Sequence, residues 1–401
     1  MRKVFQINVT ANWGSTGRIA EQINVLARKK GWSTFIAYGR YSNPSESDLI
    51  HVGSDMEVYE HYLEYRIADN DGLASRKATR KLIKKISEIK PDIIHLHNIH
   101  DHWLNYGILF NYLNTLDIPI VWTQHDCWSF TGGCGYYTVN KCTKWQMGCY
   151  RCPLKKGLLP LKDQTYRHYE LKKELFNKIK NLTLVPVSHW LEGEIRKSFL
   201  ANKHIRVIYN GIDTSIFHPS DSMFKQKYGI ENKFLLVGVA TVWSERKGLN
   251  DYLKLSNLLP DNIVMLLVGL SKKQIIHLPK GIIGIERTNN VEELADIYSG
   301  SDVVLNLSYE ETFGLTTVEG FACGTPGIVY NATASPELIT PETGIVVETG
   351  DIQGVADAVK QMLMNGKKSY SVACRKRAEE YFDKNDRYKD YIYLYEDLLR
   401  N

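Results

Sequence analysis

The sequence has no long hydrophobic run. None of its apolar stretches approaches the ~18 residues of a membrane-spanning helix. Near the N-terminus, Gln6 and Asn8 interrupt an apolar run that is already short, so this segment predicts a first strand rather than a signal peptide. We therefore expect a cytoplasmic protein, with peripheral contact at the inner membrane as an open alternative.

A strong charge of one sign is also missing. The formal net charge is only +5 over 401 residues, which permits an anionic ligand without requiring one. Low-complexity tracts and short internal repeats are absent, which argues against a disordered chain or a solenoid. The hydrophobic content of 43% is sufficient for a large core, and the length suggests two or three domains.

The cysteines do not fit a secreted disulfide framework. There are seven, an odd number, which favours metal binding or reduced thiols. Four of them are close in sequence, and the last two form a C-x-x-C pair: Cys134, Cys142, Cys149 and Cys152. Four thiolates could hold one tetrahedral, structural zinc ion, with Cys127 as a spare ligand; free thiols or a redox pair are the alternatives. We expect this Cys-rich insert, about 127–157, to line the acceptor side.

Short β-branched runs such as "KVFQINV", "PDIIHLH" and "KFLLVGVA" recur between amphipathic segments. Strands that are nearly all apolar and alternate with helices predict parallel sheets covered on both faces, hence an α/β protein. One helix is predicted over 76–90, with Leu82 and Ile86 on its apolar face and Pro91 at its end.

The alternation breaks once, at "NGIDTSIFHPSDSMF", which predicts a domain boundary near residue 213. We expect an N-terminal domain over 1–213, a second domain over 214–381 and a C-terminal helix over 382–401. An aromatic stripe in that last segment, with Tyr388, Tyr391 and Tyr395, predicts a helix packed against a core.

The stretch "YEETFGLTTVEGFACGTP" reads as a loop followed by a helix that begins around Phe313. The first-turn N–H groups at Phe313, Gly314 and Leu315 would form an anion site suited to a diphosphate. Glu311 and Glu319 flank them. Carboxylates repel phosphates, so their presence here is explained if they bind sugar hydroxyls instead. The stretch therefore suggests a sugar nucleotide; the alternative is two surface glutamates favoured by helix electrostatics.

Two carboxylates with seven residues between them, including "FGL", and "ACGTP" afterwards, resemble the signature of the retaining glycosyltransferases of family four. Other segments resemble that family in the same order: "VPVSHWLEGEIRKSF", "IRVIYNGIDTSIFHP", "VATVWSERKGLNDYL" and "TGIVVETGDIQGVADAV". The resemblance covers nearly the whole chain. It implies the GT-B fold: two Rossmann-like domains that face each other across a cleft, with a C-terminal helix that returns to the first domain.

The resemblance also implies site residues. The catalytic ones are Glu311, His125 and Lys247. The donor site comprises Arg246, Lys247, Phe313, Gly314, Leu315, Thr316, Glu319 and, in a small-residue turn of the first domain, Gly17. Many members carry an arginine where this chain has Thr241 and Val242, and Arg246 is expected to replace it. On the acceptor side we expect His97 and Asp126; the histidines of "HLHNIHDHW" are alternatively metal ligands or ordinary core residues.

We therefore expect a retaining hexosyltransferase that moves a sugar from a nucleoside diphosphate sugar, of the UDP or GDP type, to a glycan or polyprenyl-linked acceptor. The nearest resemblance is to exopolysaccharide and capsule biosynthesis. No Asp-x-Asp pair lies in a suitable loop, so no catalytic divalent metal is expected. The alternatives are a sugar-nucleotide epimerase of the same fold and a zinc-stabilised nucleic-acid-binding protein. The latter leaves the second domain unexplained, and we expect no nucleic-acid partner.

Overall fold

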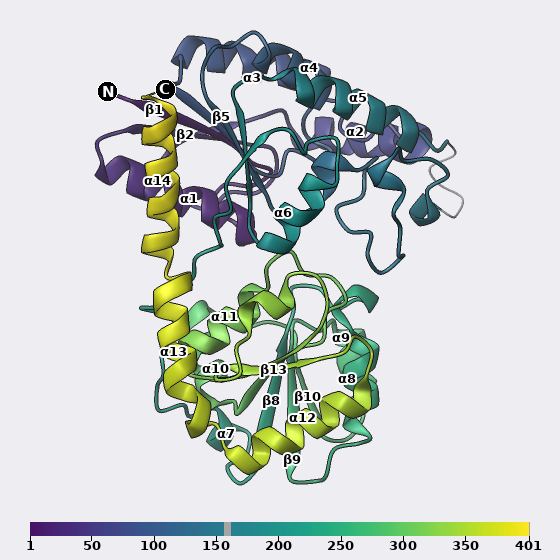
Figure 1. Cartoon of the computed structure of the whole chain (residues 1–401), viewed down its shortest axis with the longest axis vertical. Helices are drawn as coiled ribbons and strands as arrows, with labels where there is room; N and C mark the ends of the chain where they lie inside the picture. The colour runs from purple at the N-terminus through teal and green to yellow at the C-terminus, as the bar shows by residue number, and fades with distance from the viewer. Residues whose placement is uncertain (156–161, 401) are drawn as a thin grey trace. The chain divides into compact units, whose positions relative to one another are not determined.

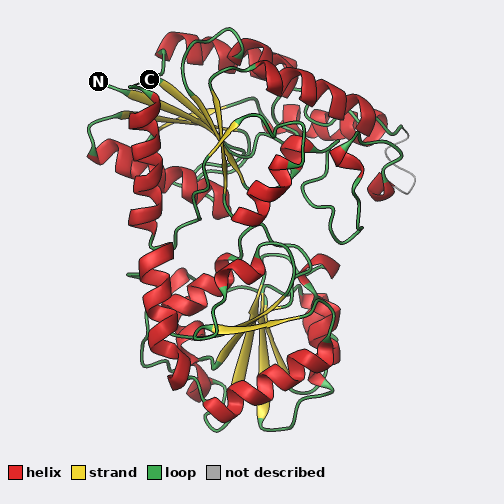
Figure 2. Ribbon diagram, viewed as in Figure 1, coloured by secondary structure: helices red, strands yellow, loops and turns green. Residues whose placement is uncertain are grey.

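The computed structural model describes residues 1–155 and 162–400, which form two compact units (Figure 1). The first unit comprises Met1–Ile208 and Asn385–Asn401, and the second comprises Tyr209–Lys384. Each is built around a parallel sheet surrounded by helices (Figure 2). Among the described residues, no helix has the length and apolar character needed to span a membrane.

The sheet of the first unit has the strand order β3-β2-β1-β4-β5-β6-β7, and all neighbouring strands are parallel. Its strands are β1 (Lys3–Ile7), β2 (Ser33–Tyr38), β3 (Asp48–His51), β4 (Ile93–Leu96), β5 (Ile120–Gln124), β6 (Leu182–Pro186) and β7 (His204–Ile205). Its helices are α1 (Gly14–Lys29), α2 (Asp55–Ala68), α3 (Arg76–Ile89), α4 (Tyr106–Leu113), α5 (Thr165–Lys178) and α6 (His189–Arg196). Strands β4, β5 and β6 are buried at every position, as expected for a parallel sheet covered on both faces.

The sheet of the second unit has the order β10-β9-β8-β11-β12-β13 and is also parallel. Its strands are β8 (Phe234–Val239), β9 (Ile263–Val268), β10 (Ile282–Ile285), β11 (Val303–Asn306), β12 (Gly327–Tyr330) and β13 (Gly344–Val347). Its helices are α7 (Phe224–Lys227), α8 (Leu249–Ser256), α9 (Lys272–Ile276), α10 (Val291–Gly300), α11 (Leu315–Ala322), α12 (Ile352–Asn365) and α13 (Lys368–Phe382). The short 3₁₀ helices of the two units are η1 (Trp128–Phe130), η2 (Lys144–Gln146), η3 (Pro153–Lys155), η4 (Glu245–Lys247) and η5 (Ser335–Leu338).

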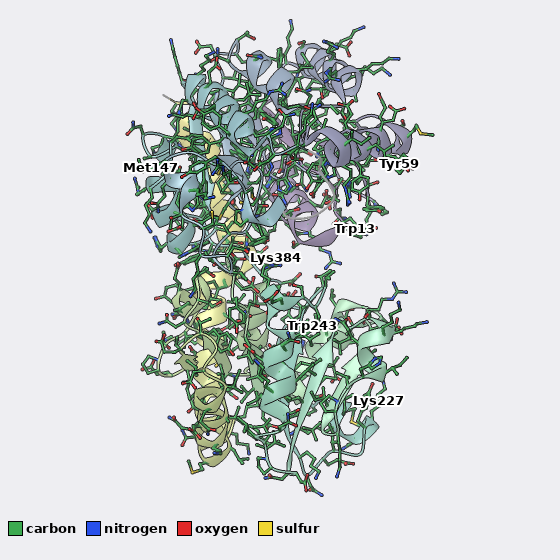
Figure 3. All side chains as sticks on the ribbon, turned by 90° about the vertical axis from the view of Figure 1, so that its right-hand side faces the viewer. Trp13, Tyr59, Met147, Lys227, Trp243 and Lys384 are labelled. Carbon is green, nitrogen blue, oxygen red and sulfur yellow. The ribbon has the colours of Figure 1, made fainter. Side chains whose placement is uncertain are left out.

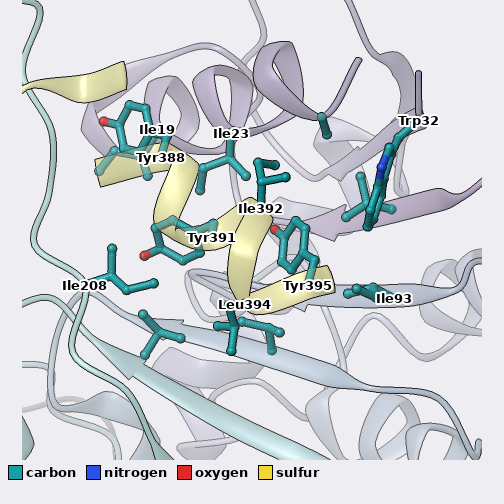
Figure 4. Close-up of a cluster of buried hydrophobic side chains, with 14 residues drawn as sticks. Ile19, Ile23, Trp32, Ile93, Ile208, Tyr388, Tyr391, Ile392, Leu394 and Tyr395 are labelled. Carbon is teal, nitrogen blue, oxygen red and sulfur yellow. The ribbon is translucent and has the colours of Figure 1, made fainter. Parts of the chain in front are cut away.

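The last helix, α14 (Lys384–Leu398), packs into the core of the first unit. Its side chains Tyr388, Tyr391 and Tyr395 are at most 4% exposed. They join a cluster that includes Ile19 and Ile23 of α1 together with one side chain from each of β1, β4, β5 and β6 (Figure 4). The aromatic stripe is therefore explained by packing: α14 buries its apolar surface against α1 and the sheet, which are distant in sequence.

The units divide after Ile208, whereas the sequence pattern placed the boundary near residue 213. The residues between belong to the second unit because their backbone pairs with its end: Ile212 N donates to Phe382 O at 2.8 Å, and Lys384 N donates to Ile212 O at 2.8 Å. Gly211 lies against the same segment, and a Cβ there would come within 2.5 Å of the Cα of Lys384.

Candidate functional site

The polar groups of the second unit gather where β8 and β11 end, at the carboxyl edge of the sheet. Lys247 of η4 forms an ion pair with the carboxylate of Glu311, and the two side chains are only 20% and 13% exposed. The two loops are also joined through their backbones. Tyr309 N donates to Arg246 O at 2.9 Å, and Arg246 Nη1 donates to Glu310 O at 2.9 Å. The carboxyl ends of parallel strands are where such sheets bind ligands.

A third loop, after β12, fixes the backbone of Glu311. Thr333 Oγ1 accepts a hydrogen bond from Glu311 N at 2.8 Å and donates one to Glu311 O at 2.7 Å. Thr333 itself has φ +49°, in the left-handed region that threonine seldom adopts. Such strain persists where the surrounding structure requires it, and here it brings the hydroxyl to both backbone groups of one glutamate.

Asp251 of α8 supports the same loops from below the surface. It is 4% exposed and accepts hydrogen bonds from Tyr309 at 2.6 Å and from Tyr330 at 2.9 Å. Burial, followed by these contacts with Asp251, raises the pKa of Tyr309 to about 12, so its hydroxyl stays a donor. Neither Asp251 nor Thr333 was identified from the sequence, because each acts through contacts between segments distant along the chain.

Helix α11 begins at Leu315, two residues later than the sequence predicted. Gly314 precedes the first turn with φ +107°, which is incompatible with a helical residue and favours glycine. Phe313 is 3% exposed, and its ring lies 5.8 Å from that of Tyr209 and 5.7 Å from that of Phe382, so its side chain belongs to the core.

The N-cap residue of α11 is Gly314, which has no side chain to cap the helix. The first-turn N–H groups of a helix have no partner within the helix, and the helix dipole adds partial positive charge there. The backbone at Leu315 and Thr316, at the end of the loop that carries Glu311, is therefore suited to a phosphate. This is the arrangement expected for a diphosphate site, although the helix starts later than predicted.

Glu319 lies further along α11 and is held by another helix. It accepts a hydrogen bond at 3.0 Å from the hydroxyl of Tyr298, a buried residue of α10. Burial and then the negative charge of Glu319 raise the pKa of Tyr298 well above its usual value, so the phenol remains protonated. The contact orients the carboxylate, and the role of Glu319 toward a ribose stays a prediction.

In the first unit, three polar side chains form a row across neighbouring strands. His97 Nε2 lies 2.5 Å from Gln6 Oε1, and His97 Nδ1 lies 3.1 Å from His125 Nε2. Burial lowers the pKa of His125 to about 4, so its imidazole is neutral near pH 7. His97 is 1% exposed with both ring nitrogens in contact with the protein, which makes it an orienting partner of His125. Direct contact of His97 with an acceptor stays a prediction.

Asp126, the residue after His125, is occupied by contacts within the unit. Its Oδ2 lies 2.9 Å from His100 Nε2, and its Oδ1 accepts from Trp128 N at 2.8 Å. Burial opposes a charge on His100, but Asp126 and Asp101 outweigh it and hold its pKa well above the usual value. His100 is thus a cation between two carboxylates. The sequence marked it only as one of several histidines.

Gly17 lies in α1, which begins at Gly14 as the small-residue turn indicated. A Cβ at position 17 would come within 2.7 Å of Thr10 Oγ1, and Gly17 O accepts from Asn12 N at 3.2 Å. Close packing against the loop after β1 is therefore one reason for a glycine here, and a phosphate contact stays a prediction. The four clustered cysteines lie in the same unit, in the segment that follows Asp126, and line one small cavity.

Both halves of the chain match families of known proteins. Residues 14–216 match a family model described as "Glycosyltransferase Family 4", and residues 231–365 match one described as "Glycosyl transferases group 1". N-acetyl-alpha-D-glucosaminyl L-malate synthase of Bacillus anthracis is 29% identical over 229 residues, 54% of this chain and 59% of the relative. The putative colanic acid biosynthesis glycosyl transferase WcaC of Escherichia coli K12 is 25% identical over 226 residues, 52% and 54%. The chain thus aligns with little more than half the length of these relatives.

Solved structures show the same fold along the whole chain. Sucrose-phosphate synthase from Thermosynechococcus elongatus has a TM-score of 0.74 at 17% identity and covers 100% of both chains. The Anabaena protein HepE, solved in complex with UDP and glucose, has a TM-score of 0.68 at 15% identity and covers 99% of this chain and 100% of its own. The predicted fold class, an α/β chain of two Rossmann-like units as in GT-B proteins, is confirmed.

Proposed function

The chain belongs to glycosyltransferase family 4, and on that premise we propose that it transfers a sugar, with retention, from a nucleoside diphosphate sugar of the UDP or GDP type. The observation that carries the donor assignment is the Lys247–Glu311 ion pair beside the start of α11, where the N-cap residue is a glycine. A cation and a helix N-terminus suit a diphosphate, and a neighbouring carboxylate suits the hydroxyls of the sugar. That the Anabaena protein was solved with UDP supports the same class of donor.

The chemistry breaks the bond between the sugar C1 and the diphosphate oxygen and forms a bond from C1 to an acceptor hydroxyl. Negative charge develops on the departing diphosphate, and we assign its stabilisation to Lys247, with help from the N–H groups at the start of α11. The guanidinium of Arg246 already binds Glu310 O, so Arg246 serves first to shape the loop. On a front-face route the leaving phosphate takes the acceptor proton, and no carboxylate nucleophile is required.

In the first unit we assign His125 to a hydroxyl of the reacting sugar. A neutral imidazole can exchange hydrogen bonds with a hydroxyl, and the low pKa of His125 keeps it neutral across the physiological range. Its contact with His97, which in turn meets Gln6, restricts the orientation of the ring. Asp126 then acts through His100, as a group that organises the loop beside His125.

For the acceptor we propose a glycan or a polyprenyl-linked saccharide in polysaccharide biosynthesis. The relative named for colanic acid biosynthesis supports this class. The relatives favour neither an epimerase nor a nucleic-acid-binding protein. They are named as glycosyltransferases or as a synthase of N-acetyl-alpha-D-glucosaminyl L-malate.

Nucleotide release from a panel of UDP-, GDP-, ADP- and dTDP-sugars, without acceptor, tests the proposal. We expect one donor to be cleaved slowly by the wild type, and Lys247→Ala to lower that rate by ~10² to 10³-fold, as for other lost contacts to a developing charge. Glu311→Ala should also lose activity. The matched control is Lys360→Ala, which removes an exposed ion pair with Asp357 in the same unit.

If no donor is cleaved and none raises the melting temperature of the wild type, the assignment of a diphosphate site is wrong. If Lys360→Ala loses as much activity as Lys247→Ala, the loss does not arise from the site.

A further inference from the structure

The segment between β5 and α5 spans residues 125–164. Its described parts, 125–155 and 162–164, contain no strand and no α-helix, only the three short turns η1, η2 and η3. Loops of this length in compact domains are uncommon and are usually functional. Yet the segment buries large aromatic side chains: Trp128, Phe130, Tyr137 and Trp145. Backbone hydrogen bonding in regular elements therefore contributes little to the order of this segment.

The residue before each of the four clustered cysteines has a positive φ. These preceding residues are Gly133 (143°), Lys141 (47°), Gly148 (144°) and Arg151 (45°). Lysine and arginine seldom adopt this conformation, which costs free energy unless the surroundings require it. The residues before Cys127, Cys323 and Cys374 have no positive φ. A preceding residue with positive φ therefore distinguishes the four clustered cysteines from the other three.

The four side chains also border one cavity. A cavity of about 20 Å³ is lined by all four of these cysteines together with Tyr137, Lys144, Trp145, Tyr150, Pro153 and Leu154. This volume holds roughly one water-sized sphere, so it fits a single ion and excludes a sugar or a nucleotide. Cys127 does not line this cavity.

The surroundings offer N–H donors, among them the ammonium groups of two lysines. Lys172 is 1% exposed, and its Nζ donates to Trp128 O at 2.8 Å and to Thr131 O at 3.2 Å. Lys144, which lines the cavity, donates to Tyr150 O at 3.0 Å. A backbone donor reaches one sulfur directly: Gly132 N lies 3.1 Å from Cys149 Sγ. Four thiolates around a dication carry a net charge of about −2, which such neighbours would stabilise.

We propose that Cys134, Cys142, Cys149 and Cys152 together bind one zinc ion that orders this segment. Zinc accepts four thiolates in a tetrahedron, and a filled tetrahedron leaves no position for a substrate, so the ion is structural. Among the described residues no three ligating side chains are already arranged to hold an ion. Binding therefore draws the four sulfurs inward around the cavity, and each thiol releases its proton to solvent.

The ion would act on the site of the first unit through the backbone. Cys127 N donates to Gly135 O at 3.0 Å, and a Cβ on Gly135 would lie 3.2 Å from Cγ of Asp126. The turn that contains Cys134 thus packs directly against Asp126, the partner of His100. Fixing Cys134 to the other three cysteines holds this turn, and with it the strand end that carries His125.

Elemental analysis of the full chain, purified with a thiol reductant and without chelator, tests the proposal. We expect about one zinc ion per chain in the wild type, as in other four-thiolate sites. Cys142→Ser and Cys152→Ser should lose it. The matched control is Cys127→Ala, a buried thiol of the same segment that lies off the cavity, and Cys374→Ala serves in the second unit. Both controls should keep the ion.

Cobalt tests the ligand set without any variant. Wild-type protein loaded with Co²⁺ should show sulfur-to-metal charge transfer in the near ultraviolet and the intense visible bands of a tetrahedral site. Wild type that contains no zinc, that contains iron instead, or whose four cysteines form two disulfides under reducing conditions would overturn the proposal. So would zinc loss from Cys127→Ala with retention in Cys142→Ser. None of these readouts depends on donor cleavage, so the zinc site and the transferase can fail separately.

Discussion

The ring Nδ1 of His95 lies 2.5 Å from the hydroxyl of Tyr395, 300 residues further along the chain. The other ring nitrogen lies 2.7 Å from Thr123 Oγ1, which also donates to the hydroxyl of Tyr391 at 3.1 Å. Burial lowers the pKa of His95 well below its usual value, so the ring is neutral, with one donor and one acceptor. The C-terminal helix is thus held by a fully buried polar network within an apolar cluster (Figure 4).

Tyr395→Phe should destabilise the first unit by ~1 to 3 kcal/mol, because it leaves a ring nitrogen of His95 buried without a partner. The matched control is Tyr393→Phe, which removes the hydroxyl of a half-exposed tyrosine on the same helix and should change stability by less than ~0.5 kcal/mol. Urea denaturation of both variants measures the difference. Equal unfolding midpoints would show that the buried contact contributes nothing.

Lys247 and Glu311 should be coupled in donor cleavage. Because they contact each other, the double variant Lys247→Ala, Glu311→Ala should lose less than the sum of the two single losses, with a coupling free energy of ~0.5 to 3 kcal/mol. The matched control is the Lys225–Asp302 pair of the same unit, at 2.6 Å and with similar burial. Lys225→Ala should lower the melting temperature and leave the KM for the donor unchanged. Strictly additive losses at positions 247 and 311 would contradict the coupling.

Gly248 should tolerate no side chain. It follows Lys247 with φ +72°, and a Cβ there would lie 2.0 Å from the carbonyl oxygen of Leu307. Gly229 has a similar φ of +63°, but a Cβ added to it would meet nothing within 4 Å, so it separates conformational strain from the clash. Gly229→Ala should lower the free energy of unfolding by ~1 kcal/mol. Gly248→Ala should lower it by clearly more and should also abolish donor cleavage. Thermal unfolding and nucleotide release measure the two effects; equal loss in both variants would argue against the clash.

The central strands were predictable because they are apolar at nearly every position, which only a covered parallel sheet explains. Two strands were missed, β3 (Asp48–His51) and β10 (Ile282–Ile285). Both lie at sheet edges, and neither contains a buried position, so neither shows the same apolar run. Exposed side chains need not follow a hydrophobic pattern: Tyr59 of α2 and Met147 are apolar or aromatic, yet both lie at the surface (Figure 3).

Within the site, the sequence identified groups whose chemistry is evident from residue type and local order. Lys247 and Glu311, 64 residues apart, were both named, and the structure brings them together. Thr333 and Asp251 were not, because a threonine hydroxyl or a helical aspartate is unremarkable until its tertiary partners are known. The start of α11 was misplaced because sequence shows that Gly314 is a glycine, but not that its φ is +107°.

Stability should depend on the protonation of His100. Its folded-state pKa is raised well above the unfolded value of ~6.5. The stabilisation from its contacts with Asp126 and Asp101 is therefore fully present below that unfolded value and is lost as the pH rises through the folded-state pKa.

His100→Gln should accordingly destabilise the protein most near pH ~6, and the difference from the wild type should shrink at alkaline pH. The control His218→Gln replaces an exposed histidine of the second unit and should give a small difference at every pH. Urea denaturation at several pH values measures both. A difference for His100→Gln that is constant, or that grows with pH, would show that the histidine is not held as a cation between the two carboxylates.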